Sequence, residues 1–210
     1  MSKLLRELSK PDSEALRSEA LEQLKVTSGK IVACDPLIFN ENHFEQTIQP
    51  GTYPIVAWWH KEDGVIAGAE LKLSESRAVG WKMATKPGQN LSELEDGYIF
   101  GYPVDTGLGC FADVEAIGKL EEIEDRLQQE LGEEFTSLYD DLIDDILTEH
   151  DEDWGNCVVC EETGSNIIIF RSGYGDGFYP SYWGIDEAGK IVSLVTDFQV
   201  LHEENFGKHQ

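Results

Sequence analysis

Basic side chains are scarce in this sequence, which has 16 Lys and Arg residues against 41 Asp and Glu residues and a formal net charge of −25. Nucleic-acid backbones and anionic membranes are bound by cationic surfaces, so we expect neither as a partner. No apolar run approaches the roughly 18 residues that a membrane-spanning helix needs. The first residues also lack the long apolar segment of an export signal, so we expect a cytoplasmic protein.

Cysteine is rare as well, with four residues in 210. Because 40% of the residues are hydrophobic, the chain can bury a core without disulfides, and free thiols are expected. Cys157 and Cys160 have the CxxC spacing of a zinc half-site or a redox pair, but the sequence has no second CxxC or HxxxH pair to complete a zinc site. Their β-branched surroundings favour two cysteines of a strand.

Hydrophobic periodicity predicts an α+β fold. Leu16, Ala20 and Leu24 share one face of a helix predicted over 13–26, and a short buried strand is predicted over 30–34. Alternating residues then predict an antiparallel meander of three strands between 51 and 84 and one of four strands between 157 and 198. We expect the two meanders to form a curved sheet or a sandwich.

Between the meanders, the 3–4 spacing of apolar residues predicts an acidic helical pair at about 114–149, interrupted at Gly132 and packed on one face of the sheet. The expected organisation is an N-terminal helical extension over 1–28 and a single domain over 29–201. This domain carries an acidic helical insertion over about 114–153, and a tail follows over 202–210.

Several glycine-rich and aromatic segments together resemble a known family. Asp105-Thr-Gly-Leu-Gly-Cys-Phe-Ala-Asp113 and Gly175-Asp-Gly-Phe-Tyr-Pro-Ser-Tyr-Trp-Gly184 are followed by Leu194-Val-Thr-Asp-Phe198, with Gly51-Thr-Tyr-Pro54 upstream. In this order the segments resemble the bacterial domain-of-unknown-function family 4241, over roughly residues 29–201. The resemblance implies a soluble bacterial domain without an assigned activity, and it gives no residue a catalytic role.

The same segments supply a candidate ligand or interface site. Acidic residues beside glycine can wrap a hard divalent cation such as Ca²⁺ or Mg²⁺. Turn and cap roles also explain these acids, because Asp113 suits a helix N-cap and Asp176 a hairpin turn. The identity of any metal stays open, and the sequence requires no cofactor. The candidate site comprises Asp105, Gly107, Gly109, Cys110, Asp113, Asp176, Tyr179, Trp183 and Asp197.

Cys110 is the thiol best placed for nucleophilic chemistry, because it follows a Gly-Leu-Gly turn, and His60 is the histidine best suited to act as its base. The strongly negative chain disfavours a thiolate, so we assign no catalytic residue. A dense aromatic cluster beside Pro180, a residue typical of edge strands, suits either packing or recognition. Its members are Tyr174, Phe178, Tyr179, Tyr182 and Trp183.

Negative charge is most concentrated between Glu121 and Asp153, where 15 acidic residues and the single basic Arg126 give a net charge of −14. Like charges four residues apart cost a few tenths of a kcal/mol in an isolated helix, so solubility alone does not explain the pattern. A concentrated negative field steers cationic proteins. The predicted partner surface comprises Glu121, Glu124, Asp125, Asp140, Asp141, Asp144 and Asp145.

Two functions therefore compete. The first is a non-catalytic interaction protein, immunity- or inhibitor-like, whose acidic face binds a basic protein. The alternative is a small-ligand or divalent-metal-binding module, or an enzyme, that uses the glycine-rich loops around Asp105–Asp113 and Gly175–Gly184. An acidic housekeeping domain is a third possibility, since net charge relates to solubility rather than to fold. The oligomeric state stays open.

Overall fold

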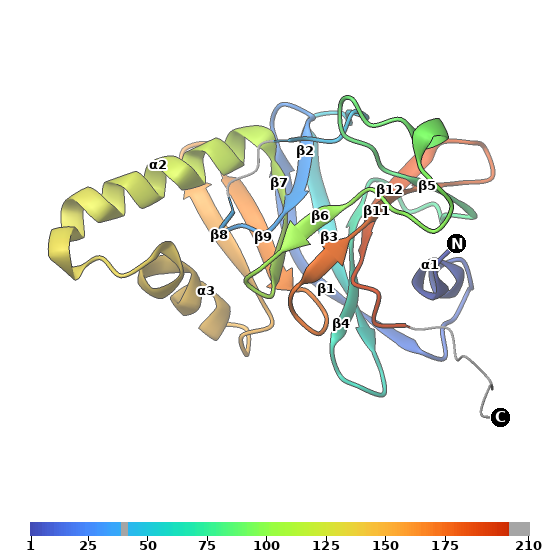
Figure 1. Ribbon diagram of the computed structural model, residues 1–210, viewed down its shortest axis with the longest axis horizontal. Helices are drawn as coiled ribbons and strands as arrows, with labels where there is room; N and C mark the ends of the chain where they lie inside the picture. Colours follow the sequence, from blue (N-terminus) through green and yellow to red (C-terminus); the bar gives the residue numbers. More distant parts are fainter. Residues whose placement is uncertain (39–41, 202–210) are drawn as a thin grey trace.

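The computed structural model describes residues 1–38 and 42–201, and it confirms an α+β fold dominated by antiparallel strands (Figure 1). The predicted tail at 202–210 lies outside the described residues. Within them, two sheets and one two-stranded ribbon carry twelve strands, and the helices gather mainly on one side. The predicted α+β class, with antiparallel strands and acidic helices on one face, is therefore correct, although the strand pairing and the second acidic helix differ from the prediction.

The larger sheet has six strands in the order β1-β3-β4-β12-β11-β5. β3 and β4 form the predicted hairpin, with Ala57 opposite Ala69. The third strand predicted for the first meander is present as β5, but its predicted pairing is wrong: β5 pairs with β11, because β12 occupies the other edge of β4. The six strands are β1 (Leu16–Val26), β3 (Gly51–His60), β4 (Ile66–Lys72), β5 (Gly80–Met83), β11 (Ser181–Ile185) and β12 (Ile191–Asp197).

The smaller sheet has four strands in the order β2-β7-β9-β8, and a ribbon of β6 and β10 lies beside it. The predicted four-stranded meander at 157–198 is wrong, because β8 and β9 belong to this sheet whereas β11 and β12 belong to the larger one. The strands are β2 (Ile31–Cys34), β6 (Tyr102–Val104), β7 (Leu108–Asp113), β8 (Trp154–Cys160), β9 (Ser165–Arg171) and β10 (Gly177–Tyr179).

The four-stranded sheet is buried on both faces, which explains the uninterrupted apolar run of β9. Ile168 and Phe170 belong to the core shared with the six-stranded sheet, and Ile167 and Ile169 belong to a second core under the helices. All four side chains are fully buried. The molecule therefore has three layers: the larger sheet, the smaller sheet and the helices.

The helical layer consists of α2 (Val114–Leu131), the 3₁₀ turn η2 (Gly132–Glu134), the π-helical turn η3 (Tyr139–Ile143) and α3 (Asp144–Thr148). The predicted break at Gly132 is confirmed, and its φ of 56° requires the left-handed conformation that glycine adopts readily. The second predicted helix, 133–149, is wrong in its first part, because η2 and residues 135–137 separate α2 from the helical turns that follow.

The helix predicted over 13–26 is also wrong, because residues 16–26 form the edge strand β1. β1 pairs with β3, and its register shifts between Ala20 and Gln23. The bulge interrupts strict alternation, and the eight-residue separation of the buried Leu16 and Leu24 is compatible with a helix as well as with a strand. Pairing with a distant strand thus overrides a composition rich in helix formers.

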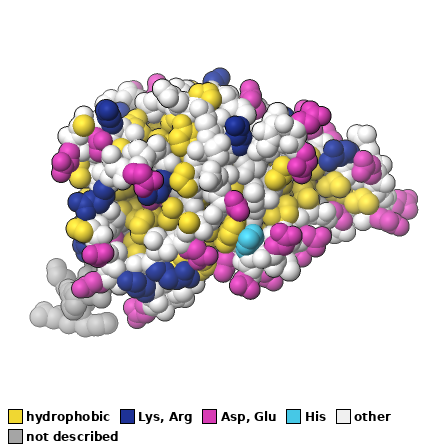
Figure 2. All heavy atoms as spheres, turned by 180° about the vertical axis from the view of Figure 1, so that it is seen from behind, with side chains coloured by type: hydrophobic (Ala, Val, Ile, Leu, Met, Phe, Trp, Pro, Cys, Tyr) yellow, Lys and Arg dark blue, Asp and Glu magenta, His cyan; other side chains and the backbone are white. Residues whose placement is uncertain are grey.

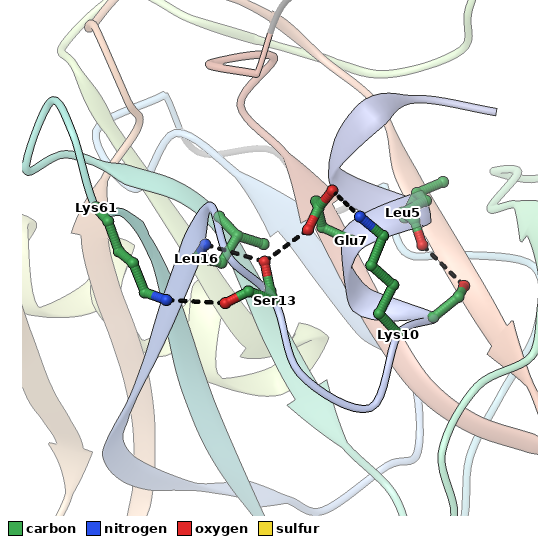
Figure 3. A network of polar contacts seen from close by, with 7 residues as sticks. Leu5, Glu7, Lys10, Ser13, Leu16 and Lys61 are labelled. Atoms are coloured by element: carbon green, nitrogen blue, oxygen red, sulfur yellow. Dashed lines mark hydrogen bonds and ion pairs between the residues drawn. The ribbon is translucent and has the colours of Figure 1, made fainter.

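The helix of the N-terminal segment is the short α1 (Lys3–Leu8), which is fastened to the start of β1 by the polar network in Figure 3. Glu7 Oε2 accepts a hydrogen bond from Ser13 Oγ at 2.8 Å, and Ser13 Oγ accepts one from the Leu16 amide at 3.0 Å. Lys61, at the end of β3, donates to the Ser13 carbonyl at 2.8 Å. α1 is therefore an integrated element of the fold.

Candidate functional site: an acidic helical hairpin

Residues 114–153 are called the acidic hairpin below. They directly follow Asp113, which caps α2 as predicted. The Asp113 carboxylate accepts hydrogen bonds from the backbone amides of Glu115, Thr27, Ser28 and Gly29 at 2.9–3.2 Å, and from the Ser28 hydroxyl at 2.8 Å. The side chain is fully buried. Asp113 therefore has a structural role, which is to fix the start of α2 against the turn between β1 and β2.

α2 packs on the four-stranded sheet mainly through its first half, and Leu127 of its second half also packs against the core under the helices. Ala116, Ile117 and Leu120 are buried, whereas all residues from Glu121 to Leu131 are half-buried or exposed. In Figure 1 this second half projects beyond the edge of the sheet at the left. The start of the helix is thus anchored in the core, and its end is presented to solvent.

The returning segment of the acidic hairpin is held by its own hydrogen bonds. The Ser137 hydroxyl donates to Asp140 and accepts from the Asp140 amide at 2.6 and 3.0 Å, while Asp141 accepts from the amides of Thr136 and Ser137 at 2.8 and 3.1 Å. These contacts resemble a capping box. Asp140 and Asp141, predicted as partner residues, therefore also stabilise the turn.

The five-residue π-helical turn η3 follows, and such turns are frequent at functional sites. Leu138, Ile143 and Leu147 are buried on this side, so the return segment packs on the second core. Gly155 of β8 permits a close approach, since a Cβ atom there would lie 2.5 Å from Cγ2 of Ile146. The return segment therefore packs directly against β8.

Few cations balance the acids of the hairpin. The one ion pair that joins the block to a basic side chain within the described residues links Glu152 to Arg171 at 3.4 Å. The pKa of Glu124 is raised, first by partial burial and then by the neighbouring charges of Asp125 and Glu121. Crowding of like charges is therefore present in the folded protein.

The predicted partner surface is accessible to different degrees along the hairpin. Glu121, Asp125, Asp140 and Asp145 are exposed, and Glu124, Asp141 and Asp144 are half-buried. Figure 2, seen from behind, shows acidic side chains along the projecting lobe at the right, with hydrophobic side chains between them. The partly exposed apolar residues of the hairpin tip are Ile123, Leu127, Leu131 and Phe135.

The two glycine-rich segments of the candidate ligand site lie together. Gly177 is the register partner of Val104, and the Ser172 amide donates to the Gly107 carbonyl at 3.1 Å. Asp105 and Asp176, next to this ribbon, are both exposed. No group of three or more His, Cys, Asp or Glu side chains suited to a metal ion occurs among residues 1–38 and 42–201.

Asp35 is a positioning residue of this junction that sequence reasoning missed. Its buried carboxylate accepts hydrogen bonds from the amides of Asp105 and Thr106 at 3.0 Å and from the Thr106 hydroxyl at 2.8 Å. The sequence feature that could have indicated this role is the position of Asp35 directly after the buried strand β2 and before Pro36. Asp35 therefore fixes the turn that leads into Gly107.

Cys110 is fully buried, and its Sγ atom lies 3.7 Å from Sγ of Cys34. Its pKa is raised well above the usual thiol value by the contact with Cys34 and by burial. The Nδ1 atom of His60 instead contacts Asp63 Oδ2 at 2.8 Å, and the Tyr174 hydroxyl donates to the same oxygen at 2.5 Å. The proposed pairing of Cys110 with His60 receives no support from this geometry.

The remaining members of the candidate ligand site are packed inside the protein. The Tyr179 hydroxyl donates to the carbonyl of Gly175 at 2.7 Å, and Trp183 packs edge to face on Phe44. Asp197 is buried and accepts from the Gln199 amide at 2.8 Å. Gly109 faces the rings of Tyr102 and Phe170, and a Cβ atom there would lie about 3 Å from both. These residues stabilise the fold.

The fold and the acidic hairpin define a class of acidic α+β proteins with two packed antiparallel sheets and a projecting helical lobe. Within this class, the chain belongs to the family described as "Protein of unknown function (DUF4241)", whose model matches residues 24–196. This confirms the family predicted from the glycine-rich segments. No curated protein and no solved structure matches the chain. Among the described residues, no helix has the length and apolar character needed to cross a membrane.

Proposed function

We propose that this protein is a non-catalytic interaction protein whose acidic hairpin binds a basic protein partner, as an immunity or inhibitor protein does. The observation that carries the proposal is the concentration of charge on a projecting element. Residues 121–153 have a net charge of −14, and the end of α2 extends beyond the sheet that anchors its start.

The energetics of the hairpin support this proposal. Partial burial, and then repulsion by Asp125 and Glu121, raise the pKa of Glu124, so keeping these like charges close together destabilises the free protein. A cationic partner would replace repulsion by attraction and would approach faster because of the field. The half-buried Ile123 and Leu131 provide apolar contact area between the acids, whereas Leu127 between them packs partly against the core under the helices.

The experiment begins with capture of a partner from a lysate at low salt, followed by stopped-flow association of the two purified proteins between 20 and 500 mM NaCl. We expect the association rate constant to fall by at least about tenfold over this range, because salt screens exposed charges. An association rate independent of salt would contradict the proposal.

A charge-reversed variant assigns the effect to the hairpin. Glu121→Lys, Asp125→Lys and Asp145→Lys change three exposed acids. A matched control reverses Glu62, Glu75 and Glu187, which are exposed in turns of the six-stranded sheet and give the same net charge. We expect the hairpin variant to lose affinity by at least about tenfold more than the control. Equal losses in the two variants would show that net charge, not the hairpin, drives binding.

The meeting of the two glycine-rich segments favours a second candidate function, a small-ligand or divalent-metal-binding module at Asp105 and Asp176. These two exposed carboxylates are fewer ligands than Ca²⁺ or Mg²⁺ usually takes. A thermal-shift titration tests this function, since a ligand bound to the native state raises Tm. An unchanged Tm with both ions and with nucleotides would exclude it.

We also propose a bacterial origin and a cytoplasmic location. The four cysteines are all free, including Cys34 and Cys110 with their sulfur atoms 3.7 Å apart, which suits a reducing compartment. Fractionation of cells that express the native gene tests the location, and recovery of the protein outside the cytoplasm would contradict it.

A further inference from the structure

The long segment between β5 and β6 encloses a surface cavity of about 520 Å³ that the function proposed above does not use. The segment spans residues 84–101, and its one helical element is the 3₁₀ turn η1 (Leu91–Glu93). In Figure 1 it lies beside β5, at the end of the molecule opposite α2. Long connections that carry a cavity are frequently binding loops.

Local hydrogen bonds hold the cavity walls in place. The Asn90 Oδ1 atom accepts from the Ser92 amide and hydroxyl at 3.1 and 2.8 Å, and the Asn90 amide group donates to Glu93 at 2.9 Å. Gln89 accepts from the Lys86 amide at 2.8 Å. The Tyr98 amide donates to the Glu95 carbonyl at 3.1 Å. The cavity is therefore formed before any ligand arrives.

The lining combines negative charge with aromatic surface. Glu93 and Glu95 contribute two exposed carboxylates, and no Lys or Arg residue lines the cavity. Tyr98 is 68% exposed, so most of its surface is available to a ligand, while Leu94 and Phe100 are half-buried and provide apolar wall. Carboxylates and an exposed aromatic ring that line one cavity suit a cation with a flat face.

We propose that this cavity binds a guanidinium group. Guanidinium is planar and permanently charged, it donates paired hydrogen bonds to carboxylates, and it stacks on aromatic rings. An ammonium group is more strongly hydrated and lacks the planar face, so it gains less from Tyr98. The proposal is independent of the acidic hairpin, because the cavity has its own lining residues at the other end of the molecule.

The test is an NMR titration of ¹⁵N-labelled full-length protein at 150 mM salt with agmatine, and separately with the peptide acetyl-Gly-Arg-Gly-amide. We expect saturable shift changes in the amides of residues 88–100. The same peptide with citrulline, which has the shape of arginine without its charge, is expected to leave these amides unshifted. Stronger binding of agmatine would indicate a free metabolite as the source of the guanidinium, and stronger binding of the peptide would indicate a protein arginine.

Variants separate the charge from the ring. Glu93→Gln with Glu95→Gln is expected to weaken binding about tenfold, and Tyr98→Ala also weakens it while Tyr98→Phe retains it. The control, Glu62→Gln with Glu187→Gln, leaves the affinity unchanged, and unchanged Tm values show that each variant is folded. Citrulline binding as tight as arginine binding, shifts outside 88–100 only, or full affinity in the Glu93/Glu95 variant would each overturn the proposal.

Discussion

The buried carboxylate of Asp113 offers the sharpest test of how the acidic hairpin is anchored. In Asp113→Ala the amide groups of Thr27, Ser28, Gly29 and Glu115 lose their acceptor. Gly29 is buried, whereas Thr27 and Ser28 are half-buried, so water can replace only part of what is lost. The substitution therefore combines the loss of a helix cap with a buried donor that has no acceptor.

The expected cost follows from these contacts. Loss of an N-cap costs about 1 kcal/mol, and a hydrogen bond to a charged acceptor contributes about 1.5–3 kcal/mol. With partial replacement by water, we expect Asp113→Ala to lower the free energy of unfolding by about 3–5 kcal/mol. Asp113→Asn keeps one acceptor oxygen but places an amide group among donors, so it should cost about half as much.

Urea denaturation followed by tryptophan fluorescence measures these differences, because the chain has five tryptophans. Glu115→Ala is the matched control, since Glu115 is exposed and its side chain accepts only from the Thr27 hydroxyl among the contacts of this turn. It should cost less than about 1 kcal/mol. A loss of about 1 kcal/mol or less in Asp113→Ala would refute the reasoning, because it would reduce Asp113 to a simple cap.

Three further predictions concern the helices and the thiols. Iodoacetamide at pH 7.5 should modify Cys160 well before Cys157. The reason is that a hydrogen bond with Thr163 lowers the pKa of Cys160, whereas burial raises the pKa of Cys157 to about 12. Mass spectrometry measures the two labelling rates, and equal rates would contradict the prediction. Glu124→Gln should stabilise the protein by about 0.3 kcal/mol at pH 7, because it removes a negative charge from a crowded acidic surface. This gain should disappear as the pH falls through the raised pKa of Glu124, where the native carboxyl is already neutral. Urea midpoints at pH 7 and pH 4 measure the difference, and an equal gain at both pH values would be inconsistent with charge repulsion. Leu120→Ala should cost about 3 kcal/mol in a urea titration, because it leaves a cavity between α2 and the four-stranded sheet, and a cost below about 1 kcal/mol would show that α2 is not anchored there.

The sequence correctly predicted the strands and helices whose hydrophobic periodicity continues along one segment of the chain. β3, β4 and α2 were recognisable because alternation or 3–4 spacing continues through each of them. The errors concern pairing between distant segments. β12 inserts beside β4, and after β9 the chain passes through the ribbon strand β10 before it enters the larger sheet at β11. No local sequence pattern indicates either connection.

In the candidate site, too, the roles set by neighbouring residues were predictable from the sequence, and those set by distant residues were not. The capping role of Asp113 followed from its place before a helical pattern, and the structure confirms it. The role of Asp35 depends on a turn 70 residues further along the chain, so its own neighbours gave only a weak signal. The acidic character of the hairpin was visible in composition, but its projection beyond the sheet depends on where the sheet ends.

The position of β1 also affects how the family should be delimited in experiments. The family model begins at residue 24, near the end of β1, although Leu4, Leu5, Leu16 and Leu24 all belong to the same core. A protein trimmed to the matched residues would lose α1, the network around Ser13 and most of an edge strand, and it would uncover apolar surface on β3 and β4. We expect such a fragment to aggregate on expression. The residues that the family model matches thus span less of the chain than the residues that form this core.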